Sequence, residues 1–135
     1  MEAFLAELRP LLDERAAVMR VMENYREHLR AYPDTLRSHA LAILDYAWAH
    51  LREHRANIAA LAVPAPCEAA MALCAESLDD LADGIESHAL CYDPNEGGET
   101  MWEVGDMYLG LADRHLAECE QLLGAAHAAC GPAEE

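Results

Sequence analysis

Residues 67–92 read CEAAMALCAESLDDLADGIESHALCY, and this stretch carries the clearest helical pattern in the sequence. Its inward stripe recurs at alternating spacings of four and three residues: Cys67, Met71, Cys74, Leu78, Leu81, Ile85, His88 and Tyr92. Acidic residues occupy the opposite side of the same helical wheel. Because this spacing gathers apolar side chains on one face, we predict an amphipathic helix from Cys67 to Cys91 that buries that face in a helical core.

Three further segments show the same periodicity, and turn signals separate them. The first predicted helix extends from Ala3 to Tyr32 and contains Pro10, a point at which it can bend. The second ends near Ala62, and Pro33 can occupy its first position. Leu36 is the first residue of its apolar stripe.

The last predicted helix begins at a capping box, Thr100-Met101-Trp102-Glu103, in which the two polar side chains bond to backbone N–H groups. Its predicted stripe is Met101, Val104, Tyr108, Leu111, His115, Cys119 and Leu122. Four long helices with short links predict an all-α fold, an antiparallel (up-down-up-down) four-helix bundle. We expect residues 1–131 to form this single domain and residues 132–135 to be a frayed acidic tail.

The charge of the chain is strongly acidic and unevenly distributed. There are 25 acidic residues against nine arginines and no lysine, for a formal charge of −16. Residues 1–63 hold nine acids and eight arginines, whereas residues 64–135 hold sixteen acids and a single arginine, Arg114. Such a field repels nucleic acid and anionic membrane and attracts basic protein surfaces. We therefore expect no direct binding to nucleic acid or membrane.

The acids of the second half predict a binding surface for a basic partner protein. The predicted partner-binding residues are Glu68, Glu76, Asp79, Asp80, Asp83, Glu86, Glu99, Glu103 and Asp106. Carboxylates spaced along rigid helices can imitate phosphates, so the partner we expect is a nucleic-acid-binding protein. Inhibitors of the anti-defence, immunity and antitoxin types can work in this way. The alternative is that these carboxylates only keep the protein dispersed.

The beginning of the sequence and its cysteines suggest a cytoplasmic location. Met1-Glu2-Ala3-Phe4 has no basic leader, and no uncharged stretch is long enough to span a bilayer. The five cysteines include no CxxC pair, so we expect reduced thiols. The sequence therefore predicts a soluble cytoplasmic protein.

The stretch His50-Leu51-Arg52-Glu53-His54 has the form HxxEH, which resembles the signature of the inverted zinc metallopeptidases. The resemblance implies that His50 and His54 bind zinc and that Glu53 is the base. It covers five of the 135 residues. That family builds its site in a large domain that contains a sheet, and this sequence predicts no strands. We therefore expect no peptidase.

A metal-binding bundle is an alternative to the partner-binding hypothesis, with zinc or another transition metal as the cofactor. Pairing residues across the predicted turns places His54, Cys74, His115 and Cys119 in one layer, with His50 at its edge. Two histidines and two cysteines are a tetrahedral zinc set. The same construction gathers a second group at the other end of the bundle: His28, His39, His88 and Cys91.

Other classes of function receive less support. A homodimeric assembly protein is a second alternative, because Leu41 and Trp48 add an apolar flank beside the main stripe of their helix.

A di-iron site requires Glu-x-x-His pairs, and none occurs. The loop that starts at Asp93 opens like a calcium loop, but its twelfth position is Val104 where a glutamate is required. With no catalytic grouping in the sequence, we expect a non-enzymatic protein without a cofactor.

Overall fold

The computed structural model describes residues 1–92 and 98–130, except for the side chains of Glu99 and Cys130. Its α-helices are α1 (Glu2–Ala31), α2 (Arg37–Ala59), α3 (Glu68–Leu90) and α4 (Glu99–Cys130), and a short 3-10 helix, η1 (Ala65–Cys67), precedes α3. No described residue lies in a strand. The predicted all-α fold is therefore confirmed. The possible calcium loop at 93–97 and the predicted tail at 132–135 lie outside the described residues.

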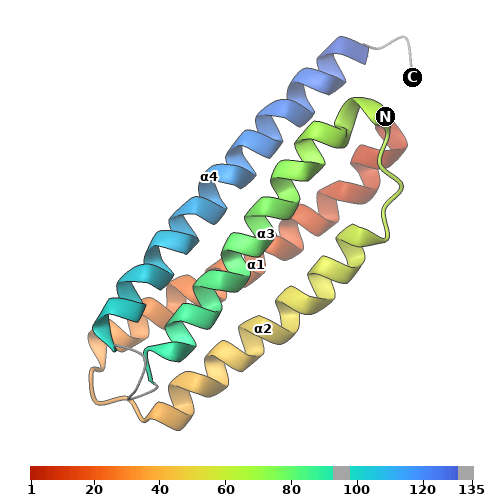
Figure 1. Cartoon of the computed structure of the whole chain (residues 1–135). Coiled ribbons are helices and arrows are strands. Elements are labelled where there is room, and N and C mark those ends of the chain that lie inside the picture. The colour runs from red at the N-terminus through yellow and green to blue at the C-terminus, as the bar shows by residue number, and fades with distance from the viewer. Residues whose placement is uncertain (93–97, 131–135) are drawn as a thin grey trace.

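The four helices lie side by side as a bundle, with consecutive helices pointing in opposite directions (Figure 1). Contacts along α1 and α2 show this directly. Asn57, near the end of α2, donates a hydrogen bond to Glu14 of α1. His28, near the end of α1, packs on His39 at the start of α2, with ring centroids 5.7 Å apart. The two helices are therefore antiparallel.

Contacts of α3 show that it is antiparallel to α4 and parallel to α1. Asp80 meets His115, whereas His88, further along α3, meets Asp106, which comes earlier in α4. The hydroxyl groups of Tyr25 and Tyr92 lie 2.9 Å apart at the same end of α1 and α3. The bundle is the predicted up-down-up-down bundle.

The inward face of α3 is the predicted one. All the stripe residues within α3 are buried, together with Cys67 just before it, and only Tyr92, beyond the end of the helix, is half-buried. The regular spacing of four and three residues keeps this stripe on one side of the helix over its whole length.

The inward face of α4 differs from the prediction. The buried residues of α4 are Gly105, Leu109, Ala112, Cys119 and Leu123. Of the predicted stripe, only Cys119 is buried; Leu122 is exposed and the remaining residues are half-buried. The buried set is a neighbouring face of the helix that contains small residues. Periodicity of large apolar residues alone could not identify it.

Two glycines explain why α4 turns this face inward. A Cβ atom on Gly105 would lie 2.5 Å from Cδ2 of His88, and one on Gly84 would lie 2.8 Å from Cδ2 of Leu109. Each would also come closer to the other glycine's carbonyl oxygen than an ordinary van der Waals contact, at 3.1 and 3.3 Å. Because neither glycine has a side chain, the backbones of α3 and α4 can approach closely here.

The turn between α1 and α2 is longer than predicted. Pro33 lies in the turn, and α2 begins at Arg37. Thr35 closes the turn, since its hydroxyl donates to the carbonyl of Tyr32 at 2.6 Å. Leu36 precedes the helix and is 74% exposed, so it does not take part in the core stripe as predicted.

The predicted capping box at the start of α4 is wrong. The carbonyl of Gly98 accepts hydrogen bonds from the N–H groups of Met101 and Trp102. Thr100 therefore lies inside the first turn and cannot cap it. Gly98 has a φ of +51°, a left-handed conformation that other residues adopt at a cost.

Pro10 does not interrupt the first helix, which continues through it, and the proline is exposed. Leu41 and Trp48, the predicted dimer flank, are half-buried against the core. Among the described residues, no helix combines the length and the apolar character that crossing a membrane requires.

Candidate functional site

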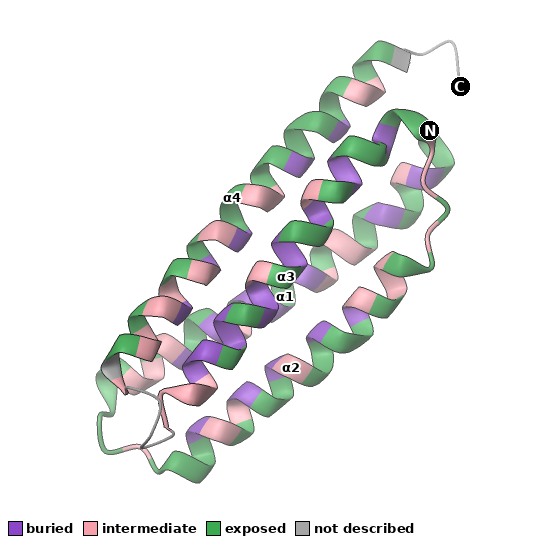
Figure 2. Cartoon of the chain, viewed as in Figure 1, coloured by how far each residue is buried: buried purple, intermediate pink, exposed green. Residues whose placement is uncertain are grey.

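The outward side of α3 consists entirely of acidic residues and alanine. Its exposed acids are Glu68, Glu76, Asp79, Asp83 and Glu86, and its other exposed residues are Ala69, Ala72 and Ala75. We call these five acids the α3 acidic stripe. Figure 2 shows the exposed bands of α3 alternating with its buried ones along the bundle. The stripe extends over roughly 27 Å at 1.5 Å per residue.

One residue of the stripe, Asp79, has an arginine beside it. Arg55 of α2 donates a hydrogen bond of 2.6 Å to Asp79, and both side chains remain largely solvent-accessible, at 42% and 65% exposure. An exposed ion pair of this kind contributes little to stability and is open to exchange with another cation. Asp79 therefore remains available to a partner.

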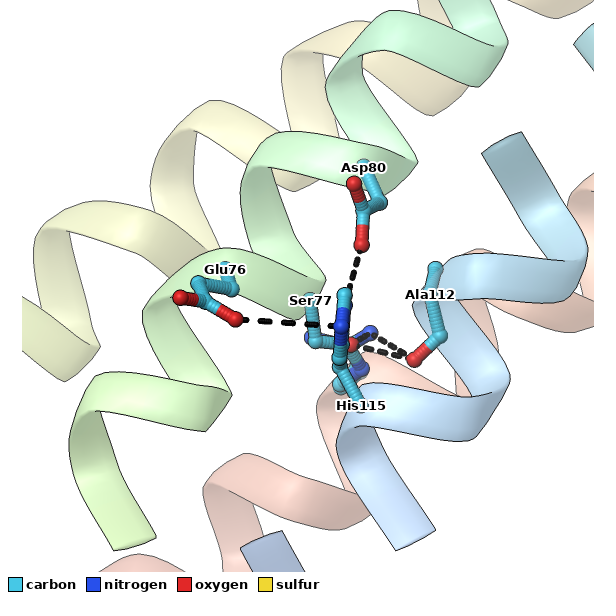
Figure 3. Close-up of polar contacts among 6 residues, drawn as sticks. Glu76, Ser77, Asp80, Ala112 and His115 are labelled. Carbon is cyan, nitrogen blue, oxygen red and sulfur yellow. Dashed lines mark hydrogen bonds and ion pairs between the residues drawn. The ribbon is translucent and has the colours of Figure 1, made fainter. Parts of the chain in front are cut away.

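Two of the predicted partner-binding residues turn toward the interior instead. Asp80 is 16% exposed and lies 2.5 Å from Nδ1 of His115, and Nε2 of the same ring is 3.7 Å from Glu76 (Figure 3). Asp106 pairs with Arg26 at 3.2 Å and with His88 at 3.1 Å. These carboxylates already have cationic or hydrogen-bonding neighbours at the edges of the helix interfaces. They do not belong to the outward surface.

Two further predicted residues lie on α4. Glu103 is exposed. Glu99 is the first residue of α4, and its side chain lies outside the described part of the chain. The open part of the predicted surface is thus the α3 acidic stripe with Glu103 on the neighbouring helix.

The uneven charge of the sequence becomes an uneven charge in space. Helices α1 and α2 contain eight of the nine arginines, whereas α3 contains no arginine and α4 contains only Arg114. Because α3 and α4 are neighbours, their carboxylates form one acidic side of the bundle. Cations and anions are mixed on α1 and α2.

The HxxEH stretch does not form one site. His50 is exposed and packs on Tyr46, with ring centroids 4.3 Å apart. His54, one turn later, is fully buried, with Nδ1 at 3.4 Å from Glu14. Burial lowers the pKa of His54, although the nearby Glu14 opposes this shift. Glu53 is exposed.

The five residues of the alternative metal site do not converge, and only Cys74 and Cys119 are neighbours. Cys74 and Cys119 lie together in the interior, His115 pairs with Asp80, and His50 and His54 occupy the positions described above. Within residues 1–92 and 98–130, no three His, Cys, Asp or Glu side chains lie close enough together to hold a metal ion. The structure therefore gives the metal alternative no assembled ligand set.

A buried polar cluster that the sequence analysis did not identify lies at the middle of the bundle. Arg15 of α1 is fully buried. It donates to the hydroxyl of Ser77, and this hydroxyl donates to the carbonyl of Ala112 at 2.5 Å (Figure 3). The sequence contains a signal for this residue. The apolar stripe of α1 is Phe4, Leu8, Leu11, Val18, Met22, Tyr25 and Leu29. It leaves a gap between Leu11 and Val18, and position 15 fills that gap.

A second buried cluster lies toward the other end of the bundle. The ring of His88 meets Tyr25 and Trp102 edge to face, at centroid distances of 5.4 and 4.4 Å. Burial lowers the pKa of His88, and Asp106 opposes this shift. Of the predicted group at this end, His28 and His39 pack together on the surface side, and His88 belongs to the aromatic core instead.

Comparison with known proteins yields no match: no protein-family model, curated protein or solved structure is similar to this chain. The fold and the charge therefore define the class on their own. The protein is an acidic, antiparallel four-helix bundle whose outward α3 surface carries only carboxylates and alanine.

Proposed function

We propose that this protein is a non-enzymatic, cytoplasmic binding protein that docks through the α3 acidic stripe on a basic surface of a partner protein. The observation that carries the proposal is the composition of the exposed side of α3, where every residue is acidic or alanine. The cytoplasmic location is supported by Cys67, Cys74 and Cys119, which are not joined in disulfides.

The geometry favours docking on a basic partner for two reasons. Alanine between the carboxylates leaves no long side chain to hold a partner away from the helix. A rigid helix also fixes the spacing of its charges before binding, so little conformational entropy is lost on association. A field concentrated on one side steers a basic partner to that side, and salt weakens this steering.

We further propose that the partner is a nucleic-acid-binding protein whose basic groove the stripe occupies, so that the bundle acts as an inhibitor. A groove built for phosphates presents several cations in a row. The five acids of the stripe are arranged along one line of about the same form. In this proposal nucleic acid competes with the protein for the same surface.

The test uses two variants with equal changes in net charge. The first reverses four acids of the stripe: Glu76→Lys, Asp79→Lys, Asp83→Lys and Glu86→Lys. The matched control reverses four exposed acids of α1: Glu7→Lys, Asp13→Lys, Glu23→Lys and Glu27→Lys. Partners are captured from the source cells, identified by mass spectrometry and purified. Calorimetric titration at about 50 and about 300 mM NaCl then measures each affinity.

We expect one partner to bind the wild type and the α1 control, to lose affinity for the stripe variant, and to be displaced by duplex DNA or RNA. Equal loss in both variants would mean that only net charge matters and would reject the stripe as the binding surface. Unchanged binding of the stripe variant would reject it too. Binding that nucleic acid does not displace would reject the inhibitor proposal while leaving the docking surface in place.

A further inference from the structure

The buried arginine at the middle of the bundle forms no ion pair with a carboxylate of the described residues. Arg15 is completely buried, and only one of its nitrogens, Nη2, makes hydrogen bonds, to Ser77 and, at 3.4 Å, to the carbonyl of Ala112. Its Nε and Nη1 have no hydrogen-bond partner among the described residues. A buried charge without a counter-ion is strongly unfavourable, so a nearby anion is expected.

The groups whose charge acts on this guanidinium are two thiols and two exposed carboxylates, Asp113 and Glu120, neither of which is in ion-pair contact with it. Cys74 of α3 and Cys119 of α4 are both fully buried. The antiparallel register that pairs Asp80 with His115 brings position 74 opposite position 119, and the two side chains lie within hydrogen-bonding reach of each other. The charges that most strongly affect Arg15 include those of both cysteines.

The two thiols are not equivalent in this setting. The hydrogen bond from Cys119 and the positive charge of Arg15 lower the pKa of Cys74 in spite of its burial. The same hydrogen bond and burial raise the pKa of Cys119. Cys74 is therefore the sulfur that more readily becomes a thiolate, with Cys119 as the thiol that donates to it.

The nearest groove does not reach this pair. It lies between α1 and α4, has a volume of about 390 Å³, and is lined in part by Leu8, Leu12, Glu120 and Leu123. Because both thiols are fully buried, a peroxide reaches them when the helices open transiently, and the rate of oxidation includes the free energy of that opening.

We propose that Cys74 and Cys119 form an oxidisable dithiol, that a peroxide converts it to a disulfide joining α3 to α4, and that Arg15 is the positioning residue that stabilises the reacting sulfur anion. This activity is independent of the proposed partner binding. It assigns to the buried cluster a role that a structural arginine alone would not have.

The reaction balances with a peroxide as the oxidant. The Cys74 thiolate attacks one peroxide oxygen, the O–O bond breaks, and hydroxide leaves to become water on protonation. The sulfur of Cys119 then attacks the resulting sulfenic acid, the S–O bond breaks, and the second oxygen leaves as water with the proton of Cys119. Two thiols and one hydrogen peroxide give one disulfide and two waters, so the sulfurs lose the two electrons that the peroxide gains.

The first test maps the product in the unmodified full chain. Reduced protein is treated with one equivalent of hydrogen peroxide, and its peptides are analysed without reduction. We expect the loss of two hydrogen atoms and a peptide pair that joins Cys74 to Cys119. Cys67 provides the internal comparison because it is equally buried but has no opposing thiol among the described residues. Oxidation of Cys67 as fast as closure of the pair, or absence of the pair's disulfide, would overturn the proposal.

The second test concerns Arg15 and measures the rate of thiol loss to peroxide. We expect Arg15→Met to slow closure of the disulfide by ~10-fold, because less Cys74 is present as thiolate. Arg15→Lys keeps the positive charge and should restore much of the rate. Circular dichroism checks that each variant is folded. A folded Arg15→Met variant that reacts at the wild-type rate would overturn the role of Arg15, and the peptide map of the wild type decides the dithiol even if that variant does not fold.

Discussion

At the scale of single residues, the bundle depends on positions where a small or buried group has no substitute. Gly105 is one such position, because its missing side chain leaves room for the ring of His88. His88 itself is fully buried between aromatic rings and bonded to Asp106. Neither role follows from the residue type, since Gly110 on the same helix has open space around it.

Gly105→Ala should destabilise the protein by about 1–3 kcal/mol, because the added methyl group would lie on the buried His88 ring and force it to move. Gly110→Ala is the matched control. It adds the same methyl group to the same helix in open space and should stabilise the protein by about 0.5–1 kcal/mol. Urea unfolding measures both. Equal effects of the two substitutions would contradict the close approach of α3 and α4 at Gly105.

The buried histidines predict a loss of stability in mild acid. Burial lowers the pKa of His54 and of His88 below the usual value of 6.5. Below that value the unfolded chain binds more protons than the folded one, so stability falls as the pH decreases. The slope approaches at most about 1.4 kcal/mol per pH unit for each histidine.

The measurement for this prediction is the free energy of unfolding from about pH 7.5 to about pH 5.5. His88→Gln should make the slope shallower by the share of one histidine. His50→Gln, at an exposed position, should leave the slope unchanged. A wild-type stability that is flat or rises on acidification would show that these two rings are not held neutral by burial.

At the scale of the elements, α3 and α2 have the same length but very different surroundings. Of the 23 residues in each helix, eleven are buried in α3 and five in α2. Helix α3 packs closely on α4 at the two glycines and has a polar contact with α1 through Ser77, and Tyr92, just after the helix, adds another. On α2, by contrast, Tyr46 is 56% exposed. Helix α3, which carries the acidic stripe, therefore has more buried residues than α2.

Hydrogen exchange should therefore be slowest in the amides of α3 and in the part of α4 around Leu109, and faster throughout α2. The physical reason is that opening α2 exposes fewer buried side chains, so its local unfolding costs less free energy. Exchange followed by mass spectrometry at peptide resolution checks this order. Protection of α2 equal to that of α3 would indicate a more uniform bundle than the burial implies.

At the scale of the whole molecule, the uneven charge opposes the stability of its acidic side. Like charges at spacings of three and four residues repel on α3, for example Glu76 with Asp79 and Asp83 with Glu86. On α1 the acids alternate with arginines. Carboxylates that repel one another on α3 are compatible with a binding role for this surface, because a basic partner would relieve their repulsion.

Neutralising two acids of the stripe, with Glu76→Gln and Asp83→Asn, should raise the stability by about 0.5–1 kcal/mol at low salt. The same change on α1, with Glu7→Gln and Glu23→Gln, should have a smaller effect because arginines lie nearby in sequence. Salt should stabilise the wild type more than the stripe variant. Thermal unfolding at low and high salt measures this, and an equal effect of the two pairs would contradict the idea of one strained acidic side.

The helices, the inward stripe of α3 and the acidic second half can be predicted from the sequence, because they depend on local periodicity and composition. The folded bundle was needed to show which face of α4 is buried, that Arg15 fills the gap in the α1 stripe, and that Asp80 and Asp106 turn inward. These features depend on the distance and register between helices. The two glycines set that distance for α3 and α4, and the value of a glycine in such a contact is apparent only when its opposite residue is known.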